Sequence, residues 1–312
     1  MKLFKPKFWD KKIGVLAIFF LPFSLVYKII LFLIKNFSTG NEFSIPIICV
    51  GNIYLGGTGK TPASIFIAKE FEKRGKKIAI VRKYYESHKD EHNLIKRYFK
   101  NLILTRDRSL GIIEAVDKKM DAVILDDGFQ DHKIIKNFNI ICFNQTQKIG
   151  NGLVIPAGPL REDLNNLSRA DIILINGKKD KNFEKKIFKI NKEVLIFYSN
   201  YKLLNIKKFR KKNLIVFAGI GNPSNFFDLL KKNKLKIKKK YIFPDHYDYK
   251  KEELTKLITE AKKNKCQIIT TEKDYYRIKN LKLNSIKYLK VKLEIKNKHK
   301  LINSLTRNEK IN

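Results

Sequence analysis

Cysteine is scarce in this chain of 312 residues. Only Cys49, Cys142 and Cys266 are present, and no two of them stand at a paired spacing. This scarcity excludes a disulfide-stabilised scaffold, and no cluster of cysteine and histidine has the ligand spacing of a zinc finger. Cys49 and Cys142 lie within apolar runs typical of buried strands. We therefore expect small buried residues in a reducing compartment.

Acidic residues are also few: 30 Asp and Glu stand against 66 Lys and Arg, a formal net charge of +36. A field of this sign attracts nucleic acid, anionic lipid or phosphorylated substrates, without choosing among them. No basic helix interleaved with aromatic residues follows a recognition motif, so we predict no nucleic-acid partner. Hydrophobic residues make up 44% of the chain, which is enough for a core and excludes a disordered protein.

An apolar run covers Ile13–Ile34, interrupted by Pro22 and Lys28. Its length suits a membrane-spanning helix. A cleaved signal peptide is a second possibility, although no small-residue cleavage site precedes Asn36, and a buried core helix is a third. The proline and a snorkelling lysine favour a bent helix that enters one leaflet without crossing it.

Charges before this run indicate its orientation, because basic residues mark the cytoplasmic side of a membrane segment. The basic residues that precede it are Lys2, Lys5, Lys7, Lys11 and Lys12. We therefore expect residues 1–40 to form a helix inserted in a membrane from its cytoplasmic side.

After residue 40, apolar strand-like runs alternate with helical patterns, which predicts a mostly parallel sheet with helices on both faces. Helices of this first domain, 41–205, are expected at Pro62–Arg74 and Gly111–Met120. Its expected strands are Ser44–Gly51, Lys77–Val81, Asn101–Leu104, Ala122–Leu125, Asn139–Phe143 and Asp171–Ile175.

A second, smaller α/β domain is expected over 206–312. Its predicted strands are Leu214–Ala218, a run ending at Phe243, and Gln267–Thr271, and its predicted helices are Ser224–Leu230 and Glu252–Lys262. The lysine-rich stretches Lys178–Lys192 and Lys202–Lys212 are expected to be surface and linker.

A glycine-rich stretch lies between an expected strand and an expected helix. It consists of Gly56, Gly57, Thr58, Gly59, Lys60 and Thr61. Glycines let the backbone wrap around phosphate oxygens, and the N–H groups at the helix start face the anion. Lys60 then reaches the β/γ-phosphates of ATP and the Thr61 hydroxyl binds Mg²⁺. The strict pattern has glycine at position 54, where this chain has Tyr54.

Two carboxylates, Asp126 and Asp127, follow the apolar strand Val123–Leu125. A strand-terminal aspartate beside a phosphate-binding loop holds Mg²⁺ directly or through water. An ordinary turn is the alternative. The pair favours a metal role because Lys60 and Thr61 are also present.

A phosphotransfer site also needs a base, and two pairs of residues are candidates. Asp90-Glu91 follows a strand on the ligand-bearing end of the parallel sheet, and Asp245-His246 follows a strand of the second domain. A carboxylate paired with histidine can deprotonate a hydroxyl group. A solvated loop is the alternative for each pair.

Together these residues resemble one family, the tetraacyldisaccharide 4′-kinases of lipid A biosynthesis in Gram-negative bacteria. The resemblance runs from about Ile47 to about Asp274 in chain order, and its most specific string is Pro156–Glu162, PAGPLRE. The other similar segments are Val50–Ile53, Gly56–Pro62, Asp126–Gln130, Gly150–Gly152, Arg169–Asp171, Ala218–Pro223, Pro244–His246 and Thr271–Asp274. The family itself lacks a glycine at the position of Tyr54.

The resemblance implies ATP-dependent phosphorylation of the 4′-hydroxyl of a tetraacyl-disaccharide 1-phosphate. It implies a P-loop α/β/α domain and a smaller α/β/α domain, with Asp90 and His246 as the acid–base pair. The nucleotide and Mg²⁺ residues that it implies are Lys60, Thr61, Asp126, Asp127 and Glu91.

For the lipid substrate, the resemblance points to Arg82, Asn151 and Arg161, with the two arginines on a basic rim that holds the 1-phosphate. The acyl chains would stay in the membrane near Phe19–Phe32. We therefore expect the protein at the inner membrane with its catalytic domains in the cytoplasm, and no obligate protein partner.

The chain departs from the family in one region. The family usually has Ser-Arg-Gly-Tyr-Gly after its second strand, whereas this chain has VRKYY at Val81–Tyr85, and the segment before Asp90 is shortened to Glu86–Lys89. Asp107 and Asp127 are the next candidates for the base.

The main alternative is a membrane-bound P-loop switch ATPase of the partitioning type. That class carries a signature lysine just before the paired glycines, where this chain has Leu55, and it does not account for Pro156–Glu162. A nucleic-acid-binding ATPase is a further alternative that rests on charge alone.

Overall fold

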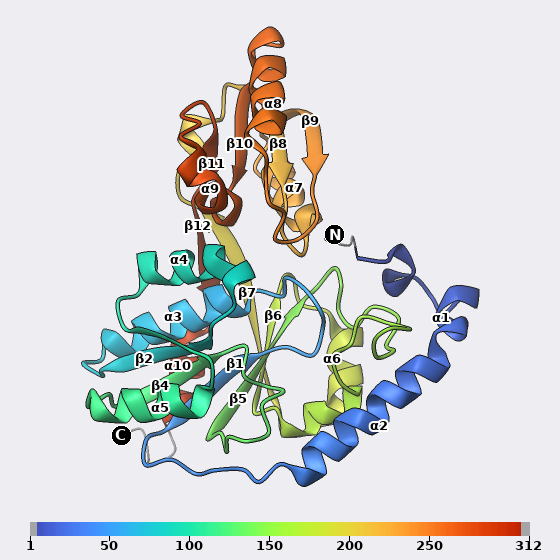
Figure 1. Ribbon diagram of the computed structural model, residues 1–312, viewed down its shortest axis with the longest axis vertical. Helices are drawn as coiled ribbons and strands as arrows, with labels where there is room; N and C mark the ends of the chain where they lie inside the picture. Colours follow the sequence, from blue (N-terminus) through green and yellow to red (C-terminus); the bar gives the residue numbers. More distant parts are fainter. Residues whose placement is uncertain (1–4, 307–312) are drawn as a thin grey trace. The chain divides into compact units, whose positions relative to one another are not determined.

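The computed structural model describes residues 5–306, and the contacts within it divide the chain into two units (Figure 1). The small unit contains Tyr85–Tyr98 and Tyr201–Glu294. The large unit contains Pro6–Tyr84, Phe99–Asn200 and the described residues from Ile295 onward. This division differs from the predicted one, because Tyr85–Tyr98 belongs to the small unit and the last helix belongs to the large unit.

A parallel sheet forms the centre of the large unit. Its strand order is β12-β7-β6-β5-β1-β4-β2-β3, and every pair from β7 to β3 is parallel. The strands are β1 (Ile47–Gly51), β2 (Ile78–Lys83), β3 (Leu102–Thr105), β4 (Ala122–Asp126), β5 (Phe138–Asn144), β6 (Ile172–Asn176), β7 (Leu195–Leu203) and β12 (Val291–Ile295). All six strands predicted for this domain are present. The chain passes between the two units within β7 and within β12.

Helices cover both faces of this sheet. Ile47 and Cys49 of β1 share one buried cluster with α5 (Arg108–Asp117) and α6 (Lys181–Phe188). The alternate residues of β1 are also buried, and α3 (Lys60–Glu72) packs on β1, β2 and β4 with α10 (Lys298–Thr306) against it. Continuous burial along a strand that is covered on both faces is typical of a parallel α/β sheet.

One stretch expected as surface and linker is a helix. Within Lys178–Lys192, α6 buries Phe183 and Ile187, and the Asp180 side chain accepts a hydrogen bond from the Phe183 N–H at 3.0 Å. The two apolar residues stand four positions apart, on one face of a helix. The linker prediction for this stretch is therefore wrong, because the many lysines masked an amphipathic pattern.

The N-terminal apolar run folds as two helices, α1 (Val15–Phe19) and α2 (Leu21–Phe37). Pro22 lies in the first turn of α2, where a missing N–H costs no helical hydrogen bond. The buried-core alternative is wrong, since Val15 is 83% exposed and Phe19 is 66% exposed. Lys28 does not extend freely but forms an ion pair with Asp163 at 2.6 Å. Within residues 5–306, no helix has the combined length and hydropathy needed to cross a membrane.

The small unit is a three-layer α/β/α arrangement. Its parallel sheet has the order β11-β10-β8-β9. Leu214 and Val216 of β8 join one buried cluster with α7, whereas Ile215 and Phe217 join another with α8. The elements are β8 (Asn213–Ala218), α7 (Pro223–Lys232), β9 (Lys236–Ile242), α8 (Lys251–Lys263), β10 (Gln267–Thr271), α9 (Glu272–Ile278) and β11 (Lys287–Leu289).

Helix α4 (Lys89–Tyr98) belongs to the small unit because it packs against α9. The Tyr98 hydroxyl donates to Glu272 of α9 at 2.8 Å. Residues 5–306 also contain five short 3₁₀ helices: Lys7–Asp10, Glu86–His88, Leu164–Arg169, Ile206–Lys208 and Lys279–Leu281.

Candidate active site

The glycine-rich loop joins the end of β1 to the start of α3. Gly56 has φ +122° and Gly59 has φ +95°, a backbone region that favours glycine because it lacks a Cβ atom. Gly59 is the N-cap of α3, so Lys60 and Thr61 stand in the first helical turn. The loop therefore lies between a strand and the N-terminus of a helix, as predicted, and its binding of phosphate stays a prediction.

Asn52 lies inside this loop and stabilises it by hydrogen bonds, although it was not among the predicted site residues. It is fully buried, and its side-chain amide donates to the Tyr54 carbonyl at 2.6 Å and to the Thr58 hydroxyl at 2.9 Å. Tyr54, which replaces the usual glycine, is also fully buried, and its hydroxyl donates to Asp10 at 2.7 Å. Tyr54 therefore ties the loop to the N-terminal segment.

Asp126 ends β4 directly beside the loop helix. Its carboxylate accepts hydrogen bonds from the Thr61 hydroxyl at 3.1 Å and from the Ser64 hydroxyl at 2.9 Å. Thr61 and Asp126, both predicted to bind Mg²⁺, are therefore in contact.

Arg82 stands opposite Asp126 in the register of β2 and β4, and its Nη1 forms an ion pair with the Asp126 carboxylate. The same Nη1 donates to the Thr61 hydroxyl at 3.2 Å, and Arg82 is only 4% exposed. Arg82 is therefore buried within the sheet instead of lying on a rim, and its predicted contact with the substrate stays a prediction. Strand β2 extends to Lys83, which keeps Arg82 within the sheet instead of in the loop after it.

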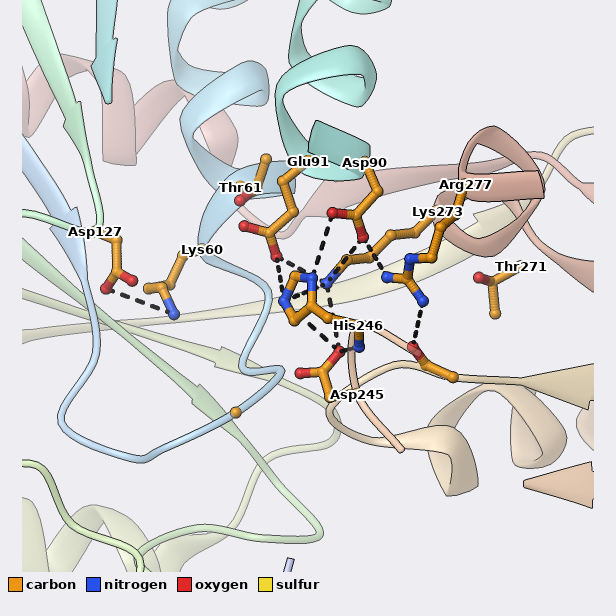
Figure 2. Close-up of polar contacts among 12 residues, drawn as sticks. Lys60, Thr61, Asp90, Glu91, Asp127, Asp245, His246, Thr271, Lys273 and Arg277 are labelled. Carbon is orange, nitrogen blue, oxygen red and sulfur yellow. Dashed lines mark hydrogen bonds and ion pairs between the residues drawn. The ribbon is translucent and has the colours of Figure 1, made fainter. Parts of the chain in front are cut away.

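Asp127 follows with a left-handed backbone at φ +63°. Its Oδ1 lies 2.8 Å from Nη1 of Arg161 and 3.6 Å from Nζ of Lys60, and Figure 2 shows the pair with Lys60. Burial alone would raise the pKa of Asp127, but Lys60, Arg161 and Arg82 outweigh it and hold the pKa well below its usual range. Asp127 is therefore an ionised carboxylate between two cations.

The most specific string of the sequence, Pro156–Glu162, pairs with the first half of the loop. The Leu55 N–H donates to the Pro159 carbonyl at 2.8 Å, and the Arg161 N–H donates to the Ile53 carbonyl at 2.7 Å. The backbone of this string thus extends the loop on one side, while the Arg161 side chain reaches Asp127.

The same string contacts the N-terminal helices. Ser24 of α2 is buried, and its hydroxyl donates to the Val154 carbonyl at 2.8 Å and accepts from the Ala157 N–H at 2.9 Å. The Tyr27 hydroxyl donates to the Arg161 carbonyl at 3.1 Å. The string is therefore a connector between the N-terminal helices and the glycine-rich loop.

Asn151 shapes this connector. Its side-chain amide donates to the Ala157 carbonyl at 2.8 Å, and its Oδ1 accepts from the Leu153 N–H at 3.1 Å. A Cβ at position 158 would meet Asn151 Oδ1 at 2.2 Å, which explains the glycine there. These bonds give Asn151 a structural task, and its predicted contact with substrate stays a prediction.

The predicted acid–base pair lies within the small unit (Figure 2). Asp90 stands in the first turn of α4 and is 3% exposed, so the solvated-loop alternative is wrong for it. Its Oδ1 is 3.3 Å from Nδ1 of His246, and its Oδ2 accepts from Nη2 of Arg277. Burial works to raise the pKa of Asp90, but His246, Lys273 and Arg277 outweigh it and hold the pKa far below its usual range.

Glu91 belongs to the same cluster. Its carboxylate lies 2.8 Å from Nζ of Lys273, a residue of the similar segment Thr271–Asp274 for which no role was predicted. Arg277 was not singled out at all. Asp107, the reserve candidate for the base, caps α5 by accepting from the Ser109 N–H at 2.8 Å.

Oxygen donors that suit Mg²⁺ are present in the large unit. Thr61, Asp126 and Asp127 supply a hydroxyl and two carboxylates, the hard ligands that Mg²⁺ uses together with substrate phosphates. Among the described residues, no group of three or more His, Cys, Asp or Glu side chains is arranged to hold a metal ion. Glu91 as a metal ligand stays a prediction, since its carboxylate is paired with Lys273.

The parallel sheet and the glycine-rich loop at the N-terminus of α3 define the class as an α/β protein with a glycine-rich loop between a strand and a helix. The model of a family described as Tetraacyldisaccharide-1-P 4'-kinase matches residues 16–310, and the chain belongs to this family. It is accordingly an enzyme, a tetraacyldisaccharide 4′-kinase. The switch ATPase alternative is not favoured.

Curated relatives agree with this assignment. The chain is 42% identical over 318 residues to the tetraacyldisaccharide 4'-kinase of Pelagibacter ubique. This match covers 99% of this chain and 100% of that protein. It is 35% identical to the Rickettsia akari enzyme of the same name, over 97% of this chain and 96% of that one.

A solved structure shares the fold. The crystal structure of LpxK from Aquifex aeolicus, described as in complex with ATP, superposes with a TM-score of 0.71. The superposition covers 94% of this chain and 99% of the Aquifex chain, and the two sequences are 24% identical.

Proposed function

We propose that this enzyme transfers the γ-phosphate of ATP to the 4′-hydroxyl of a tetraacyl-disaccharide 1-phosphate. The observation that supports this most directly is the contact of Thr61 with Asp126 at 3.1 Å, directly after Lys60 at the start of α3. The family and the named relatives support the lipid acceptor. ATP as donor is supported by the loop geometry and by the ATP complex of the Aquifex protein.

For the nucleotide, we propose that Lys60 and the loop from Gly56 to Gly59 bind the phosphates. Thr61, Asp126 and Asp127 would hold Mg²⁺, which neutralises phosphate charge during transfer. Lys60 and Arg161 both contact Asp127, so they place two further positive charges beside this set.

For the acceptor, we propose that Asp90 takes the proton of the 4′-hydroxyl. The hydroxyl oxygen then bonds to the γ-phosphorus as the bond from that phosphorus to the bridging oxygen breaks, which releases ADP. Asp90 is suited to this because its carboxylate is ionised, and His246 lies 3.3 Å from it as the partner that orients it.

We also propose that α1 and α2 insert into the cytoplasmic leaflet of the inner membrane, with both units in the cytoplasm. Large apolar side chains of these helices are exposed, a pattern that needs a partner surface. A lipid substrate supplies a reason for that surface. The exposed side chains include Val15, Leu16, Phe19, Phe23, Val26, Ile30 and Phe32.

The kinase proposal is tested with detergent-solubilised protein, ATP labelled at the γ-phosphate and a tetraacyl-disaccharide 1-phosphate. We expect transfer of label to the lipid, lost when EDTA removes Mg²⁺ and restored by added Mg²⁺. ATP hydrolysis without labelled lipid would overturn the proposal in favour of a switch ATPase.

The membrane proposal predicts a specific loss of vesicle binding. In the variant Phe19→Glu/Phe23→Glu we expect co-sedimentation with anionic vesicles to fall at least about tenfold, because burial of each phenylalanine contributes about 1.5–3 kcal/mol. Leu110→Glu, at a 63% exposed apolar residue of α5, is the matched control and should bind as the wild type does. Equal binding of all three proteins would contradict insertion through α1 and α2.

A further inference from the structure

Helix α4, which carries the proposed base Asp90, is held on the small unit by its side chains. The chain reaches the segment of α4 from Tyr84 and leaves it to Phe99, and both of these residues belong to the large unit. Of the residues that α4 buries, Asp90, His92 and Ile95, only Ile95 is apolar. Polar contacts therefore contribute much of what holds α4 against α9.

The first turn of α4 contacts one face of α9 (Figure 2). Nη2 of Arg277 donates to Oδ2 of Asp90, and Nζ of Lys273 lies 2.8 Å from the Glu91 carboxylate. Lys273 and Arg277 stand four residues apart, on one side of the helix. Nζ of Lys273 also lies 3.3 Å from Nε2 of His246, so these contacts belong to the cluster that contains the proposed acid–base pair.

The last two residues of α4 contact a different face of α9. The Tyr98 hydroxyl lies 2.8 Å from Oε1 and 2.9 Å from Oε2 of Glu272, and it donates a hydrogen bond to this carboxylate. Nε of Arg97 lies 3.7 Å from the same carboxylate, and its guanidinium lies over the Tyr276 ring, 5.2 Å from the centroid. Glu272 and Tyr276 also stand four residues apart. These contacts therefore form a second attachment of α4, separate from the proposed acid–base pair.

Glu272 is itself well fixed. It is 5% exposed and is the first residue of α9, where the helix dipole favours a carboxylate. A buried carboxylate that loses its hydrogen-bond donor is destabilising, which keeps Tyr98 paired with it. We propose that Tyr98 and Glu272 are positioning residues, which hold the end of α4 on α9 and thereby keep Asp90, at the start of α4, in place beside Arg277.

The rigidity of a helix connects its two ends. Asp90 and Tyr98 are eight residues apart in α4, a distance of about 12 Å along the helix axis. A helix that is attached at only one end can pivot about that end, whereas attachment at both ends prevents this motion. A misplacement of about 1 Å in a reacting group can lower a rate by about 10²-fold. The catalytic meaning of this inference rests on the proposed function, but the attachment of α4 does not.

The first test is the variant Tyr98→Phe, which removes one hydroxyl and keeps the ring. We expect kcat for transfer of labelled phosphate to the lipid to fall about tenfold and the KM for ATP to stay unchanged, because the base is displaced and the glycine-rich loop is not. Tyr241→Phe is the matched control, since it removes the hydroxyl that donates to Glu260 in the same unit, and it should react as the wild type does. An equal fall of kcat in both variants, or in neither, would overturn the proposal.

Variants of Glu272 test the same contact from α9. Glu272→Gln keeps an oxygen that accepts from Tyr98 and should keep kcat close to the wild-type value, whereas Glu272→Met removes the acceptor and should lower kcat as Tyr98→Phe does. The double variant Tyr98→Phe/Glu272→Met should lose no more activity than either single variant, because both changes break one contact. Losses that multiply in the double variant would contradict the proposal.

Hydrogen exchange of the full-length protein, measured by mass spectrometry without ATP or lipid, tests the attachment of α4 directly. We expect the amides of Lys89–Tyr98 to exchange faster in Tyr98→Phe than in the wild type, and at the wild-type rate in Tyr241→Phe. Unchanged exchange in Tyr98→Phe would refute the attachment. Because this measurement needs no substrate, faster exchange supports the attachment even if the wild type transfers no phosphate, so the two proposals fail separately.

Discussion

Replacement of Asp90 by asparagine is expected to lower kcat for lipid phosphorylation by about 10²–10⁴-fold, the range that a general base contributes. The amide has nearly the volume of the carboxylate and still accepts a hydrogen bond from Arg277, but it cannot take the hydroxyl proton. ATP affinity should be unchanged, because Asp90 is proposed to act on the acceptor hydroxyl and not to bind the phosphates of ATP. Labelled-phosphate transfer and ATP titration measure the two quantities.

A matched control separates loss of the base from loss of a charge. Asp228→Asn, on α7 of the same unit, makes the same chemical change away from the cluster and should transfer phosphate as the wild type does. Thermal unfolding of both variants verifies that they are folded. Transfer by Asp90→Asn within tenfold of the wild type would exclude Asp90 as the base.

The second large effect concerns stability. Asp126→Ala is expected to lower the free energy of unfolding by about 3–5 kcal/mol, because it leaves the Arg82 guanidinium buried without its counter-ion. Arg82 is 4% exposed and Asp126 is fully buried. Denaturant unfolding of both proteins measures the difference in the free energy of unfolding, provided that their m-values are the same. A decrease in the free energy of unfolding below about 1 kcal/mol would mean that the Arg82–Asp126 ion pair does not stabilise the fold by the expected amount.

A double variant distinguishes this structural role from the proposed metal role. Arg82→Met/Asp126→Leu removes both charges, and such replacements of a buried ion pair are often neutral or stabilising. We expect it to recover most of the lost stability but no Mg²⁺-dependent transfer. Glu114→Ala breaks the exposed pair with Lys118 and should cost less than about 1 kcal/mol. Recovery of transfer in the double variant would exclude Asp126 as a metal ligand.

Local patterns predicted much of the fold. The strands of the large sheet are continuous apolar runs, because a parallel sheet covered on both faces buries both sides of each strand. The helix α6 was missed since only Phe183 and Ile187 among many lysines carry its buried face. Arg82 was placed wrongly because the length of β2, and hence which residues stay in the sheet, depends on pairing with β4.

The sequence by itself determined the glycine-rich loop and the family. Loop geometry is local: glycines permit the positive φ angles, and Lys60 and Thr61 follow directly in the first turn of the helix. Only the tertiary structure decided which charges meet. Arg277 and Asp90 are 187 positions apart, and they touch because α4 packs on α9. Such contacts depend on the packing of whole elements, so no spacing along the chain predicts that Lys273 lies beside His246.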